Sequence, residues 1–541
     1  MRYDKRAGYG PKCPRYPFTI TLAKRPFMTE AALSHVFDYP PQRIKREVDF
    51  ETVIIGAGLS GIGAAIRLIR EGLGDFVILE KGIDAGGTWQ DNTYPGLTVD
   101  IPSLSYSFSF EQNPFWSSLY APGPEMKAYV DHCVTKYGVR PHMRYNMEVA
   151  DATYDEQRNV WVTRTKSGAT FTSRYLVSAT GFLTIPKLPV IEGIEKFKGK
   201  VMHTGRWDHS YDLTGKRVGF IGTGATGIQA VPEIADKVKS IDVYQRTAIW
   251  LLPKKEMPFS PRWQAAFAKV PGLQRLARLV VIFFTDIIMI NLLVFNKYFG
   301  FVGKKLERIC VNHIRNQVKD PATQEALIPT YDFGCKRPSF TSKFYPVFNR
   351  ENASLVTNPI DRITENAIVT KDGTVREIDT LICATGFEVF QKGSVPTYKL
   401  VGKNGLDISD FWEENRYQAF EGSTVPNFPN FFMMFGPYSV CTASWFGMID
   451  TQSKHLVRCL KAAKKRHANY IEIKKSANDA NFQKVQSRTK LTIFKAGNCA
   501  TSNSYYFDRH GDSPTIRPTL GFVHWLTSRF FSMNNYIFDS K

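Results

Sequence analysis

The sequence predicts an α/β protein with two Rossmann-like dinucleotide-binding domains and a helical insertion in the second. Two glycine-rich turns support this fold class: Gly56-Ala57-Gly58-Leu59-Ser60-Gly61 and Gly222-Thr223-Gly224-Ala225-Thr226-Gly227. Each turn follows an apolar run of strand character, Thr52 to Ile55 or Val218 to Ile221, and each opens a helical pattern. A glycine turn between a strand and a helix accommodates a dinucleotide pyrophosphate, so the two turns predict two bound dinucleotides.

The chain is expected to cross twice between these domains. At 541 residues it is long enough for two or three domains. The near copies Ala179-Thr180-Gly181 and Ala384-Thr385-Gly386 close the apolar runs Tyr175 to Ser178 and Thr380 to Cys383, and we interpret them as the crossings. The expected organisation is a basic N-terminal arm (1–50), a first nucleotide domain in two parts (51–186 and 379–541, with the C-terminal tail), a second nucleotide domain in two parts (187–252 and 331–378) and a helical insertion (253–330).

The strand that follows each glycine turn indicates which dinucleotide binds there. The strand Phe76 to Leu79 ends in Glu80, whose carboxylate would accept hydrogen bonds from ribose hydroxyls and repel a 2′-phosphate. The strand Ile241 to Tyr244 is followed instead by Arg246 and Thr247, which suit a phosphate. The first site is therefore predicted to bind FAD and the second NADPH. The glycines that approach these cofactors would be Gly56, Gly58, Gly61, Gly222, Gly224 and Gly227.

Composition and cysteine spacing argue against other classes. The formal net charge is +20, but we recognise no nucleic-acid-binding module and expect no nucleic-acid partner. Eight scattered cysteines without a C-x-x-C pair argue against a metal site, a disulfide framework and a dithiol redox centre. We therefore expect a reducing, cytoplasmic setting. The N-terminal residues lack the continuous apolar stretch of a secretory signal.

One apolar segment, Leu279 to Phe295, is the candidate for membrane contact. It is short for a span and contains Asp286 and Asn291, both costly in hydrocarbon, so we expect a buried or interfacial helix. The lysines just beyond it would suit peripheral attachment to anionic lipid; they are Lys297, Lys304 and Lys305.

The stretches Phe197 to Asp208, Gly86 to Asp100 and Phe333 to Arg337 resemble motifs of the Baeyer–Villiger monooxygenases, a family of class B flavin-dependent monooxygenases. The stretch from Phe197 to Asp208 fits the pattern F-x-G-x-x-x-H-x-x-x-W-[P/D], in which related enzymes that oxidise nitrogen or sulfur usually carry Tyr at the position of Trp207. A second pattern is matched by Gly86-Gly87-Thr88-Trp89, Tyr94-Pro95-Gly96 and Asp100, and the family's catalytic-arginine loop by Phe333-Gly334-Cys335-Lys336-Arg337. The likeness runs from about residue 51 to about residue 510.

The resemblance implies roles for individual residues. Arg337 would be the catalytic arginine, and Asp100 would hold its guanidinium in place near the flavin. Lys336 would bind the 2′-phosphate beside Arg246, and the flavin would be lined by Trp89 and Tyr106. His203 and Trp207 would act conformationally at the linker between domains, although His203 alone would first suggest a general acid or base. Thr442, Trp445 and Phe446 correspond to a substrate-lining loop, with a plain core role as the alternative. The family often has a tryptophan where this chain has Asn503-Ser504-Tyr505-Tyr506.

The implied reaction converts a small ketone to an ester or lactone with NADPH and O2, through a C4a-peroxyflavin. A permanently charged guanidinium suits both the anionic peroxide and the oxyanion formed after carbonyl attack. Oxidation of sulfur or nitrogen with the same cofactors is the alternative. The missing C-x-x-C disfavours a disulfide reductase, and a non-catalytic flavoprotein that acts as a binding module is a further alternative. We expect a monomer or homodimer in the cytoplasm, with peripheral membrane contact compatible with the apolar segment.

Overall fold

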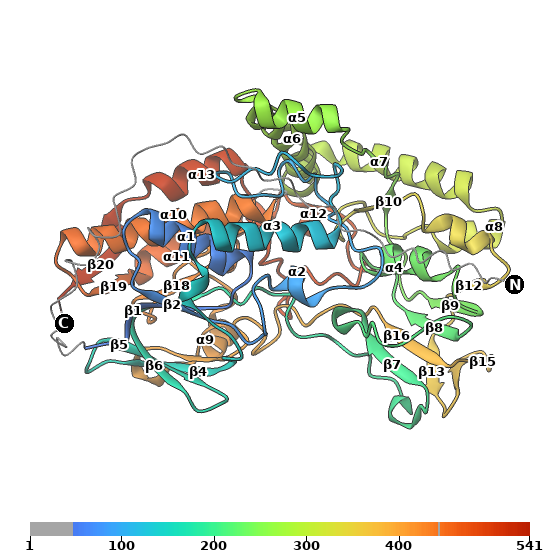
Figure 1. Cartoon of the computed structure of the whole chain (residues 1–541), viewed down its shortest axis with the longest axis horizontal. Coiled ribbons are helices and arrows are strands. Elements are labelled where there is room, and N and C mark those ends of the chain that lie inside the picture. The colour runs from blue at the N-terminus through green and yellow to red at the C-terminus, as the bar shows by residue number, and fades with distance from the viewer. Residues whose placement is uncertain (1–46, 442–443, 541) are drawn as a thin grey trace, which may run out of the picture. The chain divides into compact units, whose positions relative to one another are not determined.

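The structure, a computed structural model, describes residues 47–441 and 444–540, without the side chains of 288–291. The predicted N-terminal arm lies outside the described residues except for 47–50. From Val48 onward the chain forms one unit. Its two main sheets are visible on the left and right of Figure 1, and each contains one of the predicted glycine turns.

The first sheet has eight strands in the order β17-β4-β5-β6-β1-β2-β3, with β18 also beside β6. Strand β1 runs parallel to β2 and β6, whereas β4, β5 and β6 form an antiparallel meander. The bounds are β1 Phe50–Ile55, β2 Phe76–Leu79, β3 Met143–Arg144, β4 Val149–Asp155, β5 Val160–Thr165, β6 Thr170–Ser178, β17 Lys399–Val401 and β18 Phe431–Met433.

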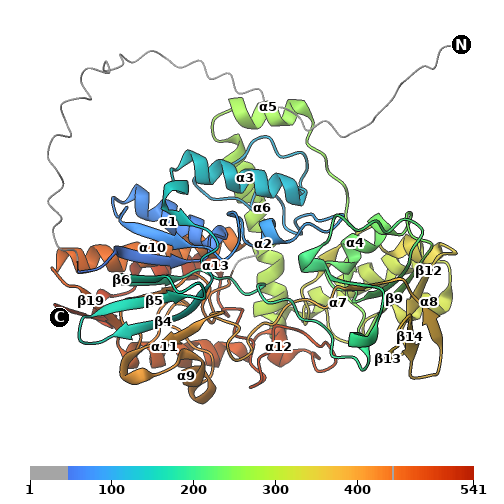
Figure 2. The same ribbon diagram turned by 60° about the horizontal axis from the view of Figure 1, so that its bottom comes forward.

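Helices cover this sheet, and the first of them, α1, begins at the glycine turn. Helix α1 starts at Leu59, as predicted, and packs against α10, to which the ion pair Arg67–Asp450 joins it at 2.7 Å. Figure 2 shows α1, α3 and α10 on one side of the strands and α9 on the other. The bounds are α1 Leu59–Arg70, α2 Thr88–Asp91, α3 Gly123–Lys136, α9 Ile408–Asn415, α10 Trp445–Lys465, α11 Lys475–Thr489, α12 Ile493–Ala496 and α13 Gly521–Phe530.

The second sheet contains five parallel strands in the order β12-β9-β8-β16-β7. Its bounds are β7 Lys200–His203, β8 Arg217–Ile221, β9 Ser240–Tyr244, β12 Ala353–Val356 and β16 Thr380–Cys383, with α4 Gly227–Ile234 after the second glycine turn. Smaller sheets pair β10 Leu251–Leu252 with β11 Ser339–Phe340, β19 Tyr470–Ile473 with β20 Tyr536–Asp539, and β14 Ala367–Thr370 with both β13 Ile360–Ile363 and β15 Val375–Glu377.

The strands predicted around the two glycine turns are confirmed. The runs expected at Phe76–Leu79 and Thr380–Cys383 are β2 and β16. Strand β6 begins earlier than expected, at Thr170, because its first half pairs with β5 and its second half with β18. Four helices follow within the range 253–330: α5 Pro261–Lys269, α6 Leu273–Met289, α7 Asn296–Gln317 and α8 Pro321–Ala326. The helix over Leu273–Val294 is long and apolar enough to cross a membrane by length and composition alone.

The two segments that leave the paired Ala-Thr-Gly sequences run side by side. The amide of Lys187 donates to the carbonyl of Gly386 at 2.9 Å, and the amide of Glu388 donates to the carbonyl of Ile185 at 3.0 Å. Since one segment follows β6 of the first sheet and the other follows β16 of the second, both connections between the sheets pass through one place.

The structure contains a disulfide, although the cysteine spacing argued against a disulfide framework. Cys335 and Cys499 form a disulfide with Cα atoms 5.2 Å apart, across 164 residues of sequence. The cysteines were judged by spacing along the chain, which does not report this proximity in space. Asp332 adds two hydrogen bonds beside the disulfide, since its amide donates to the Asn498 carbonyl at 3.1 Å and its carboxylate accepts from the Asn498 amide at 2.8 Å.

Reduction of this disulfide is expected to destabilise the protein. A cross-link over so long a loop stabilises by about 2–4 kcal/mol, chiefly by restricting the unfolded chain. Dithiothreitol should therefore lower the apparent Tm of the wild type and leave that of Cys335→Ser/Cys499→Ser unchanged. In guanidinium, two fewer thiols should react with Ellman's reagent before reduction than after it. Equal thiol counts would show that the cysteines are not paired.

Candidate active site

The first glycine turn is packed so closely that side chains are excluded at two of its positions. Gly56 has a φ of 105°, and a Cβ there would lie 2.7 Å from the carbonyl oxygen of Ala179. A Cβ at Gly61 would lie 2.0 Å from the carbonyl oxygen of Gly56. Gly58 is different, since its Cβ would meet only the Cα of Gly87, at 3.7 Å. The turn thus leaves its outer side open for a pyrophosphate at the start of α1.

Glu80 lies against this turn. Its buried carboxylate accepts hydrogen bonds from the amides of Ala57 and Gly82, both at 2.7 Å. These bonds fix the carboxylate beside the glycines, and each oxygen retains a lone pair for a further donor. The geometry therefore fits the ribose contact that the sequence predicts.

The second glycine turn repeats the first, contact for contact. Gly222 has a φ of 111°, and a Cβ there would lie 2.5 Å from the carbonyl oxygen of Ala384. A Cβ at Gly227 would lie 2.4 Å from the carbonyl oxygen of Gly222, whereas one at Gly224 would meet no atom within 4 Å. The alanines of the two Ala-Thr-Gly sequences thus serve the same purpose in both sheets: each carbonyl touches the first glycine of its turn.

A cluster of cations lies beyond β9, on the side of the second turn. Burial, followed by the nearby Arg246 guanidinium, lowers the pKa of Lys336 to about 8. Because two like charges disfavour each other, this pair favours an anion between or beside them. The Thr247 hydroxyl accepts a hydrogen bond from the side-chain amide of Asn503 at 2.9 Å. Sequence reasoning noted Asn503 only as part of a departure from the family, and nothing in its position signalled this contact.

Arg337 and Asp100 form a two-pronged ion pair. Nε of Arg337 donates to Oδ2 of Asp100 at 2.8 Å, and Nη2 donates to Oδ1 at 2.9 Å. Both side chains are about one quarter exposed, at 27% and 28%. Burial alone would lower the pKa of Arg337, but the Asp100 carboxylate outweighs it and the pKa lies above its ordinary value. The guanidinium is therefore permanently charged, oriented and still accessible.

The segment that carries Asp100 is fastened to the second sheet's helix α4. The Gln229 side chain accepts from the Tyr94 hydroxyl at 3.0 Å and donates to the Thr98 carbonyl at 3.1 Å. A Cβ at Gly96 would lie 2.5 Å from the carbonyl oxygen of Gln229. This contact gives a physical reason for the Tyr-Pro-Gly motif, and the sequence contained no signal that Gln229 was its partner.

Aromatic rings surround the ion pair. Tyr106 is buried, with its ring 5.8 Å from that of Trp89 and 5.1 Å from that of Phe446. Tyr505, which is 42% exposed, and Tyr506, which is buried, lie near Arg337 with their rings 4.8 Å apart, and burial raises the pKa of Tyr506. The position at which the family often has tryptophan is thus occupied by a pair of phenols.

The predicted substrate loop is described only in part. Thr442 lies outside the described residues. Phe446 is fully buried and packs on Phe108 as well as Tyr106, whereas the half-buried Trp445 packs on Phe182 and Phe435. Phe446 therefore packs against Tyr106 as a core residue. Of Trp445 and Phe446, only Trp445 is partly exposed.

His203 lies near the place where the connecting segments run side by side, whereas Trp207 packs on the second sheet. His203 ends β7, accepts a hydrogen bond from the Gly205 amide at 3.0 Å and packs edge-on against Phe387. Burial lowers its pKa, so the imidazole is neutral near pH 7. These positions suit a joint between domains better than a proton carrier.

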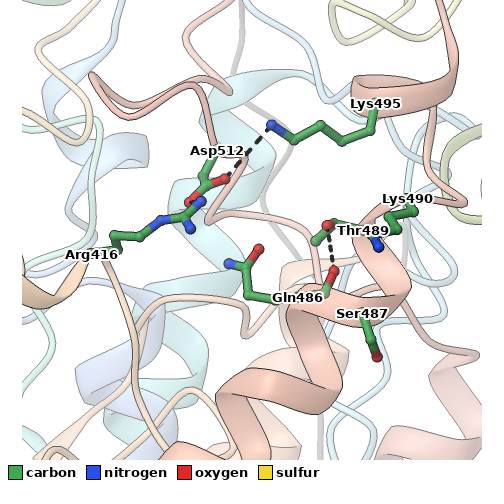
Figure 3. Close-up of a pocket in the computed structure, with 7 residues that line it drawn as sticks. All are labelled: Arg416, Gln486, Ser487, Thr489, Lys490, Lys495 and Asp512. Carbon is green, nitrogen blue, oxygen red and sulfur yellow. Dashed lines mark hydrogen bonds and ion pairs between the residues drawn. The ribbon is translucent and has the colours of Figure 1, made fainter.

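A separate cavity of about 500 Å³ lies on other elements (Figure 3). Its lining side chains come from α11, α12 and three loops: Arg416, Gln486, Ser487, Thr489, Lys490, Lys495 and Asp512. Within this cavity, Asp512 forms an ion pair with Arg416. Since this lining contains none of the predicted site residues, we place the candidate active site at the Arg337–Asp100 pair.

Comparisons with known proteins agree with this geometry. A family profile described as pyridine nucleotide-disulphide oxidoreductase matches residues 53–275. A Baeyer-Villiger monooxygenase of Pseudomonas aeruginosa is 36% identical over 492 residues, 90% of this chain and 91% of that protein. An oxidized steroid monooxygenase bound to NADP superposes with a TM-score of 0.80 at 27% identity, covering 91% of this chain and 100% of the other. The OTEMO complex with FAD and NADP superposes with a TM-score of 0.78 at 28% identity, over 91% and 100%.

Proposed function

The chain belongs to the Baeyer–Villiger monooxygenase family, and we propose that Arg337 and Asp100 are its catalytic pair. As a member, it is an FAD-dependent enzyme that uses NADPH to insert an oxygen atom next to a ketone carbonyl. The observation that supports the proposal is the two-pronged ion pair, whose members are 237 residues apart in sequence. The pair is accessible and lies near Tyr106, whose ring packs against that of Trp89.

The two glycine turns fit the two cofactors. Gly58 and Gly224 leave open space where the other glycines of each turn are tightly packed, as a pyrophosphate would require. We place FAD at the first turn, with Glu80 toward its ribose, and NADPH at the second. The proposed domain limits follow: 51–186 and 379–541 for FAD, 187–252 and 331–378 for NADPH, and 253–330 for the helical insertion.

When FAD is bound and has been reduced by NADPH, it would react with O2 and so make one oxygen atom available for transfer. The Arg337 guanidinium stabilises negative charge that develops on oxygen at the ketone carbonyl, because it remains cationic throughout. Asp100 orients that guanidinium and lowers the cost of keeping its charge partly buried. The side chains of Tyr505 and Tyr506 lie near the same guanidinium.

The second site recognises the 2′-phosphate through Arg246, Lys336 and Thr247. The pKa of Lys336 is lowered first by burial and then by the nearby Arg246 guanidinium, and this closeness of two cations supports the assignment. His203 and Trp207 are assigned to the joint between the domains. We further propose that the enzyme is a cytoplasmic monomer or homodimer whose contact with membranes, where present, is peripheral.

Replacement of Arg337 should separate the two halves of the reaction. In Arg337→Ala, NADPH should still reduce FAD at close to the wild-type rate, whereas ester formation should fall by about 10³-fold or more, because the oxyanion loses its charged partner. Arg337→Lys keeps the charge but loses the forked geometry and serves as the matched control. Stopped-flow flavin absorbance and product analysis measure the two steps. Ester formation retained in Arg337→Ala would refute the assignment, and sulfoxide as the sole product of the wild type would favour heteroatom oxidation.

Replacement of Arg246 should affect NADPH selectively. Loss of a charge-assisted contact to the phosphate should raise the KM for NADPH by about 10- to 100-fold in Arg246→Ala. The KM for NADH, which lacks the phosphate, is the internal control and should change little. Equal changes in the two constants would show that Arg246 does not contact the phosphate.

The KM for NADPH should also depend on pH through Lys336. The pKa of about 8 means that Lys336 is charged below pH 8 and loses its proton above it. The KM for NADPH should therefore rise as the pH increases from 7 to 9, while the KM for NADH stays level. Lys336→Gln should show a high KM at pH 7 and no such rise. A rise that persists in this variant would assign the titration to another group.

A further inference from the structure

Helix α6 exposes a row of large apolar side chains, although two of its polar side chains are buried. Leu276, Leu279, Val280, Phe283, Phe284 and Ile287 are between 40% and 63% exposed. The spacing of three and four residues places them along one stripe of the helix. Gln274 and Arg278 are instead buried. A surface helix in water usually turns its polar side chains to the solvent. This exposed apolar stripe therefore indicates contact with an apolar partner.

The buried polar side chains attach α6 to the body of the protein. Arg278 donates to the Leu104 carbonyl at 3.1 Å and to the Ser107 hydroxyl at 3.0 Å. Gln274 donates to the Asn113 carbonyl at 2.6 Å. Because these bonds hold one side of α6 on the protein, the helix lies along a surface and does not cross a membrane.

Neighbouring helices extend the apolar surface and add positive charge. Figure 1 shows α5, α6 and α7 together along one edge of the structure. Exposed aromatic residues occur on α5 and at the start of α7: Trp263, Tyr298, Phe299 and Phe301. Exposed cations of the same helices are Arg262, Lys269, Arg275, Lys297, Lys304, Lys305, Arg308 and Arg315, of which Lys304 is paired with Glu307 and Asp332. The acidic residues of these three helices are Asp286 and Glu307, and both are half-buried.

We propose that the exposed face of α5, α6 and the start of α7 docks on an anionic phospholipid surface. Apolar and aromatic side chains would enter the boundary between headgroups and acyl chains, while the cations contact the phosphates. A second copy of this chain fits less well, because pairing the same face would bring its cations together on a chain of net charge +20. The proposal specifies the partner of the peripheral contact and depends on no step of the reaction.

Vesicle flotation with the full-length, FAD-loaded enzyme tests the proposal without turnover. The wild type should bind phosphatidylcholine vesicles that contain phosphatidylglycerol, more strongly than phosphatidylcholine alone, and added salt should weaken binding. Leu279→Ser/Phe283→Ser should lower binding by about 10-fold or more, since two large apolar side chains leave the lipid. Lys269→Glu/Arg275→Glu should remove the preference for anionic vesicles.

The matched control is Val190→Ser/Val375→Ser, which alters exposed apolar side chains on other elements and should bind as the wild type does. FAD content and NADPH-dependent flavin reduction report folding in each variant. Three outcomes would overturn the proposal. The wild type does not bind anionic vesicles, or Leu279→Ser/Phe283→Ser binds them as strongly as the wild type, or the wild type is a dimer and this variant is a monomer. The last result would assign the face to a second copy of the chain.

Discussion

The ion pair between Arg337 and Asp100 is the interaction on which the arrangement of the active site depends. Each partner is held by its own support. Asp100 follows a segment that Gln229 fastens to α4, and Arg337 follows a loop that the disulfide from Cys335 ties to the C-terminal part of the chain. The pair therefore forms where segments from both halves of the molecule converge.

The two nucleotide sites show how one constraint can be met twice in a chain. In each, the first glycine of the turn touches the carbonyl of an alanine that ends a neighbouring strand, Ala179 or Ala384. The chain then leaves each sheet through the glycine that follows. The crossings between sheets consequently begin at the floors of the cofactor sites, and His203 lies beside one of them. A movement of these connecting segments would therefore displace residues next to both glycine turns.

Local patterns were sufficient to predict the strands around each turn, the start of α1 and the contrast between Glu80 and Arg246, because these features depend on residues close in sequence. The family motifs extended this to Asp100 and Arg337, which the structure brings into contact. Contacts between residues far apart in sequence could not be predicted from local patterns. They are the Cys335–Cys499 disulfide, the contact of Gln229 with Gly96 and the hydrogen bond of Asn503 with Thr247. Helix α6 shows the same limit, since its apolar content was evident but the side that it turns to the protein depends on Leu104, Ser107 and Asn113.

The cationic cluster of Lys336 and Arg246 has a consequence for the order of events in the catalytic cycle. Hydride transfer changes the nicotinamide ring but leaves the 2′-phosphate untouched. A site that holds the nucleotide by this phosphate cannot sense whether the coenzyme has been oxidised. If Lys336 and Arg246 bind this phosphate as proposed, their contacts to it would be the same before and after hydride transfer, and other residues would have to control the release of the oxidised coenzyme.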